Sequence, residues 1–159
     1  MATTISGLST LGVLFGYAVE ATAGTKPAAF TQIERCNAIG GINLTPEAID
    51  SSALEDDITR YIKGRMDHGG SWTVTFNLTN DTMTQIEAMQ TAYGELTGGK
   101  KMWATVYIPD MTKAFFAVVQ PPTAIPLPET GQNELLTIEL EFILEEIKGW
   151  DTAIRPTAP

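Results

Sequence analysis

The sequence predicts a mainly β domain, a β-sandwich or barrel, that carries one α-helix. Three observations support this fold class. Apolar and polar residues alternate with period two in several segments, one segment of about twenty residues changes to helical spacing, and the composition is globular, with 43% apolar and 18% charged residues. A chain of 159 residues is expected to form a single domain, 1–159, with its own core.

The first part of the chain has weak local preferences. Residues 1–28 are rich in Gly, Ala, Thr and Ser and are interpreted as an extended N-terminal arm. The run LSTLGVLFGYAVEATAG resembles a signal peptide, but no Lys or Arg precedes it and glycines and Glu20 interrupt it, so we expect no secretory signal. FTQIERC, residues 30–36, is a plausible short strand that Gly40 and Gly41 follow as breakers.

The next two elements are the best defined. SWTVTFNL, residues 71–78, alternates apolar with polar side chains and predicts a strand with one buried face. Residues 80–99 predict a helix, because Met83, Ile86, Met89, Tyr93 and Leu96 form one stripe. Asp81 or Thr82 is expected to cap this helix, with Gln85 completing a capping box behind Thr82. Gly94, or the pair Gly98 and Gly99, is expected to end it.

The C-terminal half predicts more strands. KMWATVYI (101–108) alternates, a turn at 109–112 leads into KAFFAVV (113–119), and a proline-rich loop occupies 120–133. A loop of this length in a small domain often contacts a partner. Residues 134–146 fit a strand better than a helix because the alternation is sustained, and the final RPTAP is expected to fray.

The segment 41–70 is interpreted as an arm outside the sheet. Within it, residues 53–70 are the most charged stretch of the chain, with the acidic Glu55, Asp56 and Asp57 ahead of the basic Arg60, Lys63 and Arg65. A monomer would gain little by keeping such arms.

No constellation for catalysis is visible, so we expect no enzyme and no cofactor. His68 is the only imidazole and is interpreted as a polar turn residue, because no nucleophile motif accompanies it. Cys36 is interpreted as a small apolar side chain rather than a nucleophile. One His and one Cys make no zinc set, and neither a calcium loop nor a phosphate loop is present.

The net charge of −9 argues against a nucleic-acid clamp, which needs basic side chains to neutralise phosphates. A single cysteine permits no internal disulfide and suits a reducing compartment. No segment approaches the roughly 20 apolar residues of a membrane span, so no membrane contact is expected.

Three parts of the chain, in order, resemble a known family. They are SALEDDITRYIKGRMDHGGSWTVTFNLTNDT, then a capped helix ending in AYGEL followed by KKMWATVYIP, then TKAFFAVVQPPTAIPLPETGQNELLTIELEFILEEIKG. This order of elements is similar to that of the tail tube (major tail) proteins of long-tailed, non-contractile, siphovirus-type bacteriophages. The resemblance covers about residues 5–152 and is carried by the ordered set rather than by one specific motif.

The resemblance implies a tail-tube fold, similar to that of the type VI secretion tube protein, with an extended N-terminal arm and long loops. It implies hexameric rings that stack into a tube through which DNA passes, without specific binding, during ejection. It further implies a virion protein assembled in the host bacterial cytoplasm, whose partners are its own copies, a tape-measure protein inside the tube, a tail terminator, and baseplate or distal tail proteins. The family has no catalytic, cofactor or metal residues to carry over.

Two sets of residues are expected to serve such a tube. Polar residues of the alternating strands are expected to face the lumen: Ser71, Thr73, Thr75, Asn77, Thr137, Glu139 and Glu141. The charged segment is expected to contact a neighbouring subunit by pairing its acidic and basic halves head to tail, through Leu54, Glu55, Asp56, Asp57, Arg60, Tyr61, Lys63 and Arg65. The alternative is a solvated hairpin whose charges contribute nothing measurable.

Other functions remain open at this point. The chain also suits the tube of a type VI-like apparatus or a phage-tail-like bacteriocin, or a tail terminator. A monomeric β-sandwich that binds a ligand through its proline loop is a more distant alternative, and an enzyme using scattered carboxylates comes last.

Overall fold

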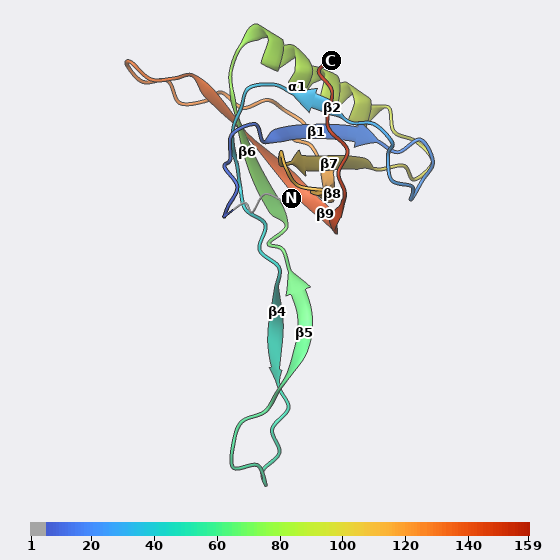
Figure 1. Cartoon of the computed structure of the whole chain (residues 1–159), viewed down its shortest axis with the longest axis vertical. Coiled ribbons are helices and arrows are strands. Elements are labelled where there is room, and N and C mark those ends of the chain that lie inside the picture. The colour runs from blue at the N-terminus through green and yellow to red at the C-terminus, as the bar shows by residue number, and fades with distance from the viewer. Residues whose placement is uncertain (1–5) are drawn as a thin grey trace.

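The computed structural model describes residues 6–159, and the predicted fold class is confirmed, since the chain is mainly β with one helix (Figure 1). Residues 1–5 of the predicted N-terminal arm lie outside the described residues. The elements are, in chain order, β1 Leu14–Val19, β2 Thr31–Ile33, β3 Cys36–Ile39, β4 Thr45–Asp50, β5 Tyr61–Asp67, β6 Ser71–Asn77, α1 Asn80–Gly94, β7 Met102–Tyr107, β8 Lys113–Gln120 and β9 Thr137–Thr152.

Seven strands form one antiparallel sheet in the order β2-β1-β7-β8-β9-β6-β3. Within the described residues this sheet is not closed into a barrel, because β2 and β3 are its two edges. These edge strands are consecutive in the chain and are joined only by Glu34 and Arg35. Since the chain from Ile33 to Cys36 spans at most about 11 Å, the sheet must curl until its edges lie close together.

The bend between the two edges corrects the single strand predicted for residues 30–36. Arg35 has a φ of +59°, which ends β2 and turns the chain into β3. The amide of Glu34 donates to the Gln85 Oε1 atom at 2.8 Å. Gln85 therefore fastens this bend to α1 rather than completing the predicted capping box.

The main core fills the concave side of the curled sheet. Phe15 of β1 packs at 5.6–5.7 Å between ring centroids against Trp72, Phe76 and Phe142. Trp72 and Phe76 belong to β6, which three strands separate from β1 in the sheet. Such contacts require the strong curl deduced from the short link. Ile86 and Met89 of α1, two members of the predicted stripe, are buried in the same core.

The N-cap of the helix lies two residues before Asp81 and three before Thr82, the two predicted caps. Thr79 is the N-cap, and its Oγ1 atom accepts a hydrogen bond from the Thr82 amide at 3.1 Å, while the Thr82 side chain is itself buried. The last helical residue is Gly94, one of the two predicted ends. The strands predicted at 71–78 and 113–119 are confirmed. The strand predicted at 134–146 is present as β9, but it begins at Thr137 and extends to Thr152, so the proline-rich loop predicted at 120–133 occupies 121–136.

A second, smaller core covers the convex face over β1, β7 and β8. Phe30, Trp103 and Phe116 are its largest members, and Ala153 and Ile154 pack against it. Both faces of β7 are therefore buried, whereas the alternation in 101–108 predicted only one.

The C-terminal residues are held in place, so the prediction that RPTAP frays is wrong. Thr157 forms a bridge to Thr31 on the edge of β2, and the Gln32 amide donates to the Thr157 carbonyl at 2.8 Å. Pro156 lies so close to Gly16 that a Cβ on this glycine would come within 2.7 Å of the proline ring. The bridge from Thr157 to β2 covers one edge of the sheet.

Residues 14–19 differ from the extended arm predicted for 1–28. They form β1, inside the sheet between β2 and β7, and Phe15, Gly16, Tyr17 and Ala18 are all buried. A strand covered on both faces shows no period-two alternation, so the pattern could not reveal it.

Residues 41–70 leave the sheet as the hairpin of β4 and β5, which extends below the rest of the molecule in Figure 1. Residues 121–136 contain no helix or strand and form a second projection, the orange loop at the upper left. Among the described residues, no helix has the length and apolarity needed to cross a membrane.

Candidate functional site

The seven residues predicted to face a lumen lie together on one face of the β6–β9 ladder. The register pairs Thr73 with Glu141, Thr75 with Glu139 and Asn77 with Thr137. Directly opposite residues of an antiparallel pair share a face, so the whole set, with Ser71 at its end, forms one polar strip. All members are exposed or half-exposed while the opposite face is core. Whether this strip lines a channel stays a prediction.

The polar strip is acidic. Glu139 and Glu141 line a hollow beside the proline-rich loop, and Glu129 and Glu134 line the adjoining hollow. No Lys or Arg lines either hollow, and none of these four carboxylates makes an ion pair with a described residue. An unneutralised carboxylate surface repels phosphate.

The strand β9 has unpaired stretches on both of its sides. Among residues 6–159, no strand pairs with 137–142 on the β8 side, where pairing begins only at Ile143, although these residues pair with β6. Residues 145–152 pair with β8, but no described strand lies on their β6 side, because β6 begins opposite Ile143. Each stretch offers backbone groups to a further strand.

The β4–β5 hairpin carries apolar side chains that nothing in the described chain covers. Ile49 lies opposite Ile62, Pro46 lies opposite Met66, and all four are exposed. An isolated two-stranded hairpin is marginally stable in water, so a second layer is needed to stabilise this one.

The residues predicted to contact a neighbour occupy the end of this hairpin and strand β5. Leu54 is fully exposed at the connecting loop, and Tyr61 is 62% exposed at the start of β5. Lys63 and Arg65 lie on β5, Glu55 and Asp57 lie in the connecting loop, and none of these four makes an ion pair with a described residue.

The predicted charge pairing between subunits is corrected for Asp56 and Arg60, which pair with each other within one chain. Arg60 Nε lies 3.3 Å from the Asp56 Oδ1 atom, and the Asp56 Oδ2 atom accepts from the Ala53 amide at 2.8 Å. This acid and this base therefore pair within one loop, because their spacing of four residues lets them meet across it. The free charges for a neighbour are reduced to Glu55, Asp57, Lys63 and Arg65.

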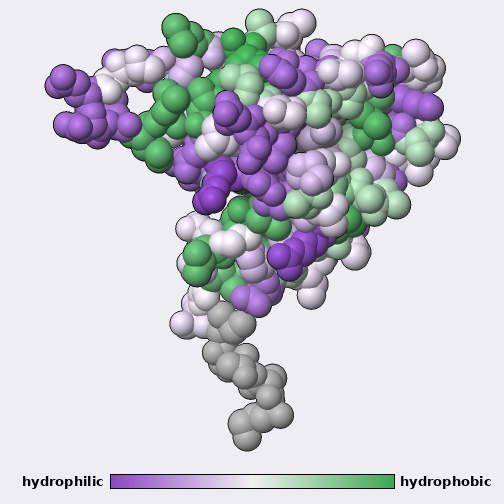
Figure 2. Space-filling model, turned by 90° about the horizontal axis from the view of Figure 1, so that it is seen from above, coloured by the Kyte–Doolittle hydropathy of each residue, from purple (hydrophilic) through white to green (hydrophobic). Residues whose placement is uncertain are grey.

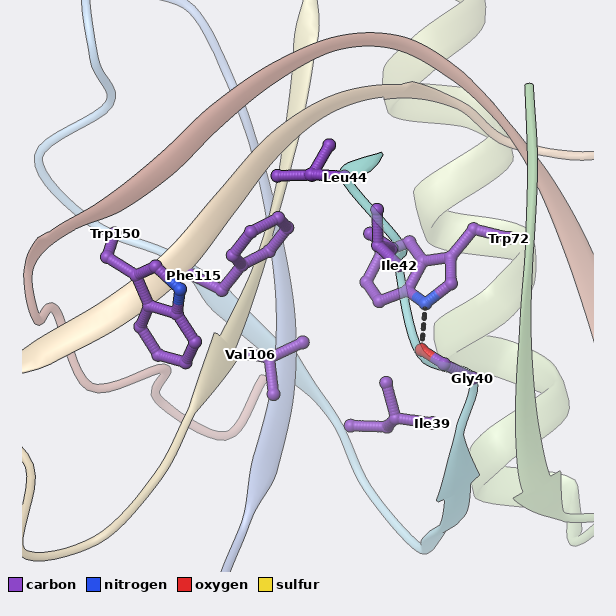
Figure 3. A pocket seen from close by; sticks show the side chains of 8 residues that line it. All are labelled: Ile39, Gly40, Ile42, Leu44, Trp72, Val106, Phe115 and Trp150. Atoms are coloured by element: carbon purple, nitrogen blue, oxygen red, sulfur yellow. Dashed lines mark hydrogen bonds between the residues drawn. The ribbon is translucent and has the colours of Figure 1, made fainter. Parts of the chain in front are cut away.

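An apolar groove, which the sequence did not indicate, opens at the end of the curled sheet near the hairpin (Figure 3). Its walls are Ile39, Gly40, Ile42, Leu44, Trp72, Val106, Phe115 and Trp150. Trp150 is 52% exposed and meets Phe115 edge to face at 5.6 Å. Trp72 is buried behind the groove and donates from Nε1 to the Gly40 carbonyl at 2.6 Å. The residues come from five separate segments, so no local pattern could reveal the groove.

His68 and Cys36, the two side chains considered for catalysis from the sequence, lie in surroundings typical of structural residues. His68 accepts a hydrogen bond at Nδ1 from the Gly70 amide at 3.2 Å, as a turn residue does. Burial raises the pKa of the Cys36 thiol to about 11, which leaves little thiolate at neutral pH. Within residues 6–159, no three His, Cys, Asp or Glu side chains gather in an arrangement that could hold a metal ion.

Comparisons with known proteins give likeness in structure alone. No family model matches the chain, and no curated protein matches it. Among solved structures, the chain is similar to a chain of the "Cryo-EM structure of the anti-feeding prophage (AFP) baseplate, 6-fold symmetrised", with a TM-score of 0.49 and 13% identity over 93% of this chain and 96% of that chain. A likeness of this size carries no functional argument.

Proposed function

We propose that this chain is a structural subunit of a phage-type tail tube, which assembles with its own copies into rings that stack around a channel for DNA. The observation that carries the proposal is the β4–β5 hairpin, which projects from the sheet with exposed apolar side chains. Contact with another copy would cover these side chains. The resemblance of the sequence to tail tube proteins supplies the ring size of six.

The unpaired stretches of β9 support the same proposal. A subunit that places a strand beside residues 137–142 or 145–152 of its neighbour continues the sheet from copy to copy. Closure around a ring then removes these edges, as closure of any barrel does. The curled sheet of one chain would become one sector of a larger inner barrel.

The acidic strip on β6 and β9 is the proposed channel wall. Duplex DNA carries one negative charge per roughly 1.7 Å and binds basic surfaces by releasing counterions. A wall bearing Glu139 and Glu141 without a neighbouring cation gives DNA no such site. DNA would pass without being retained, and the proposal includes no catalytic step and no cofactor.

Microscopy of the purified chain tests the proposal directly. We expect negative-stain images of the concentrated protein to show rings or tubes, and its mass in solution to include hexamers. Tubes support a tube subunit of a phage, a type VI-like apparatus or a bacteriocin, whereas single rings that never stack support a tail terminator. A stable monomer at every concentration would contradict the proposal.

Charge reversal tests the channel wall. The double variant Glu139→Lys/Glu141→Lys should still fold, because both side chains are exposed, and its tubes should retain double-stranded DNA at low salt and release it as salt rises. Co-sedimentation of labelled DNA with assembled tubes, across a salt series, measures this. The matched control, Glu87→Lys/Glu95→Lys on and after α1, should not retain DNA inside the tube. Equal retention by both variants would remove β6–β9 from the channel.

A further inference from the structure

The proline-rich loop and the apolar groove lie at opposite ends of strand β9. The loop, residues 121–136, directly precedes Thr137 at the start of the strand, whereas Trp150 of the groove lies near its end. At about 3.3 Å per residue, the path from Leu136 to Trp150 measures about 46 Å. Figure 1 shows β9 running from the loop at the upper left to the lower right. In this structure the loop lies against Thr137 and Glu139 near the start of β9, and none of its residues lines the groove of its own chain.

The loop carries an exposed apolar side chain, that of Leu127, between two prolines. Leu127 is 92% exposed and stands between Pro126 and Pro128, which restrict the backbone to an extended course. Leu127 and Leu135 both line the hollow that also holds Glu129 and Glu134, and Leu135 is exposed as well. In Figure 2 the loop forms the lobe on the left, with a hydrophilic tip and hydrophobic side chains nearer its base.

The groove has an apolar, partly aromatic lining that suits such a segment. Its walls are apolar, and it holds Phe115 and the half-exposed Trp150 side by side. Grooves lined by aromatic rings bind proline-rich segments, because a segment that is already extended loses little entropy on binding.

Charge at the two surfaces is complementary. Lys113 precedes Phe115 by two residues on β8, with no register shift between them, so it shares the groove's face of the sheet. Its ammonium group makes no ion pair with a described residue, and neither does Glu129 beside Pro128. A segment seated with Leu127 in the groove has an acidic side chain within reach of this lysine.

We propose that residues 126–129 of one copy dock into the groove of a second copy, with Leu127 against Trp150 and Phe115, while Ile125 stays packed against the main core of its own chain. This inference rests on the proposed self-assembly and names the surfaces through which one contact is made. The groove and the root of the hairpin share Leu44 and so lie at one end of the molecule. Two different surfaces in contact generate a ring or an open stack rather than a closed dimer.

A peptide tests the docking without requiring assembly. The peptide QPPTAIPLPET, residues 120–130, is titrated into the full chain while tryptophan fluorescence is recorded, since Trp72 and Trp103 are buried and Trp150 is exposed. We expect saturable binding at least about ten times tighter than that of the same peptide with Leu127→Asp, and loss of the signal in a Trp150→Phe chain. Equal binding of the two peptides, or no binding, overturns the proposal, as does exclusive binding of the hairpin peptide SSALEDDITR, residues 51–60.

The variant chain separates this inference from the proposed function. Leu127→Asp in the full chain should raise the concentration needed for assembly at least about tenfold and leave the unfolding midpoint unchanged, because Leu127 is exposed. If the wild type forms tubes and the Leu127→Asp variant assembles normally, the docking is refuted and the proposed tube function is kept. Specific peptide binding by a chain that never assembles keeps the docking and refutes the tube.

Discussion

The double variant Ile49→Ser/Ile62→Ser should lose assembly while its sheet unfolds at the same denaturant concentration as the wild type. These two exposed residues face each other across the β4–β5 hairpin. The two side chains are 46% and 57% exposed, so a contact that covers both buries about as much surface as one full side chain, which contributes about 1.5–3 kcal/mol. Each 1.4 kcal/mol is about tenfold in affinity. The concentration required for assembly should therefore rise about tenfold to a hundredfold in sedimentation and microscopy.

Two comparison variants make this result specific. Leu11→Ser removes an apolar side chain outside the hairpin that is more exposed than either isoleucine, and this variant should assemble normally. The variant Arg60→Ala/Lys63→Ala/Arg65→Ala should weaken assembly by about tenfold or less, because exposed ion pairs contribute about 1 kcal/mol or less each and Arg60 already has Asp56 as its partner. Normal assembly of the double serine variant would mean that the hairpin makes no contact between copies.

Phe15→Ala should destabilise the fold by about 3–5 kcal/mol, the usual cost of removing a buried aromatic ring. Phe15 is fully buried and touches three other aromatic rings on strands that lie far from β1 in the sheet. A domain of this size has a free energy of unfolding of about 5–15 kcal/mol, so the variant approaches the limit of folding at 37 °C. Urea unfolding followed by tryptophan fluorescence measures the loss.

Phe115→Ala is the matched control for this prediction. Phe115 is half-buried at the groove and packs on the exposed Trp150, so its removal leaves a smaller cavity and should cost about 1–2 kcal/mol. Equal losses in the two variants would show that the curl of the sheet does not depend on the contacts between Phe15 and β6.

The elements predicted well from the sequence are those with one face buried in the core and one face exposed to solvent. Strands β6 and β9 are of this kind, and their alternation places Thr73 and Thr75 on one face of β6 and Glu139 and Glu141 on one face of β9. The pairing of β6 with β9, which the alternation does not give, joins the two faces into one surface. Their common exposure was predictable because a strand with a single buried face must alternate.

The elements that were missed are those covered from both sides or assembled from distant segments. Strand β1 is buried on both faces, and Gly16, against which Pro156 packs, hides its pattern further. The C-terminal segment gains its order from the edge of β2, more than a hundred residues away. Nothing local in RPTAP encodes such a contact. The groove is likewise a product of the fold, because its walls meet only after the sheet has curled.

The exposed hairpin also bears on how growth of a tube would begin. An isolated two-stranded hairpin is marginally stable, so two free subunits that meet must hold both hairpins in place at once, whereas a subunit that joins a finished ring meets hairpins that the ring already stabilises. Starting a ring is then slower than extending one, so pure protein should remain dispersed through a lag period that preformed fragments abolish. In a cell, the same asymmetry would let a separate starter complex decide where and when each filament begins.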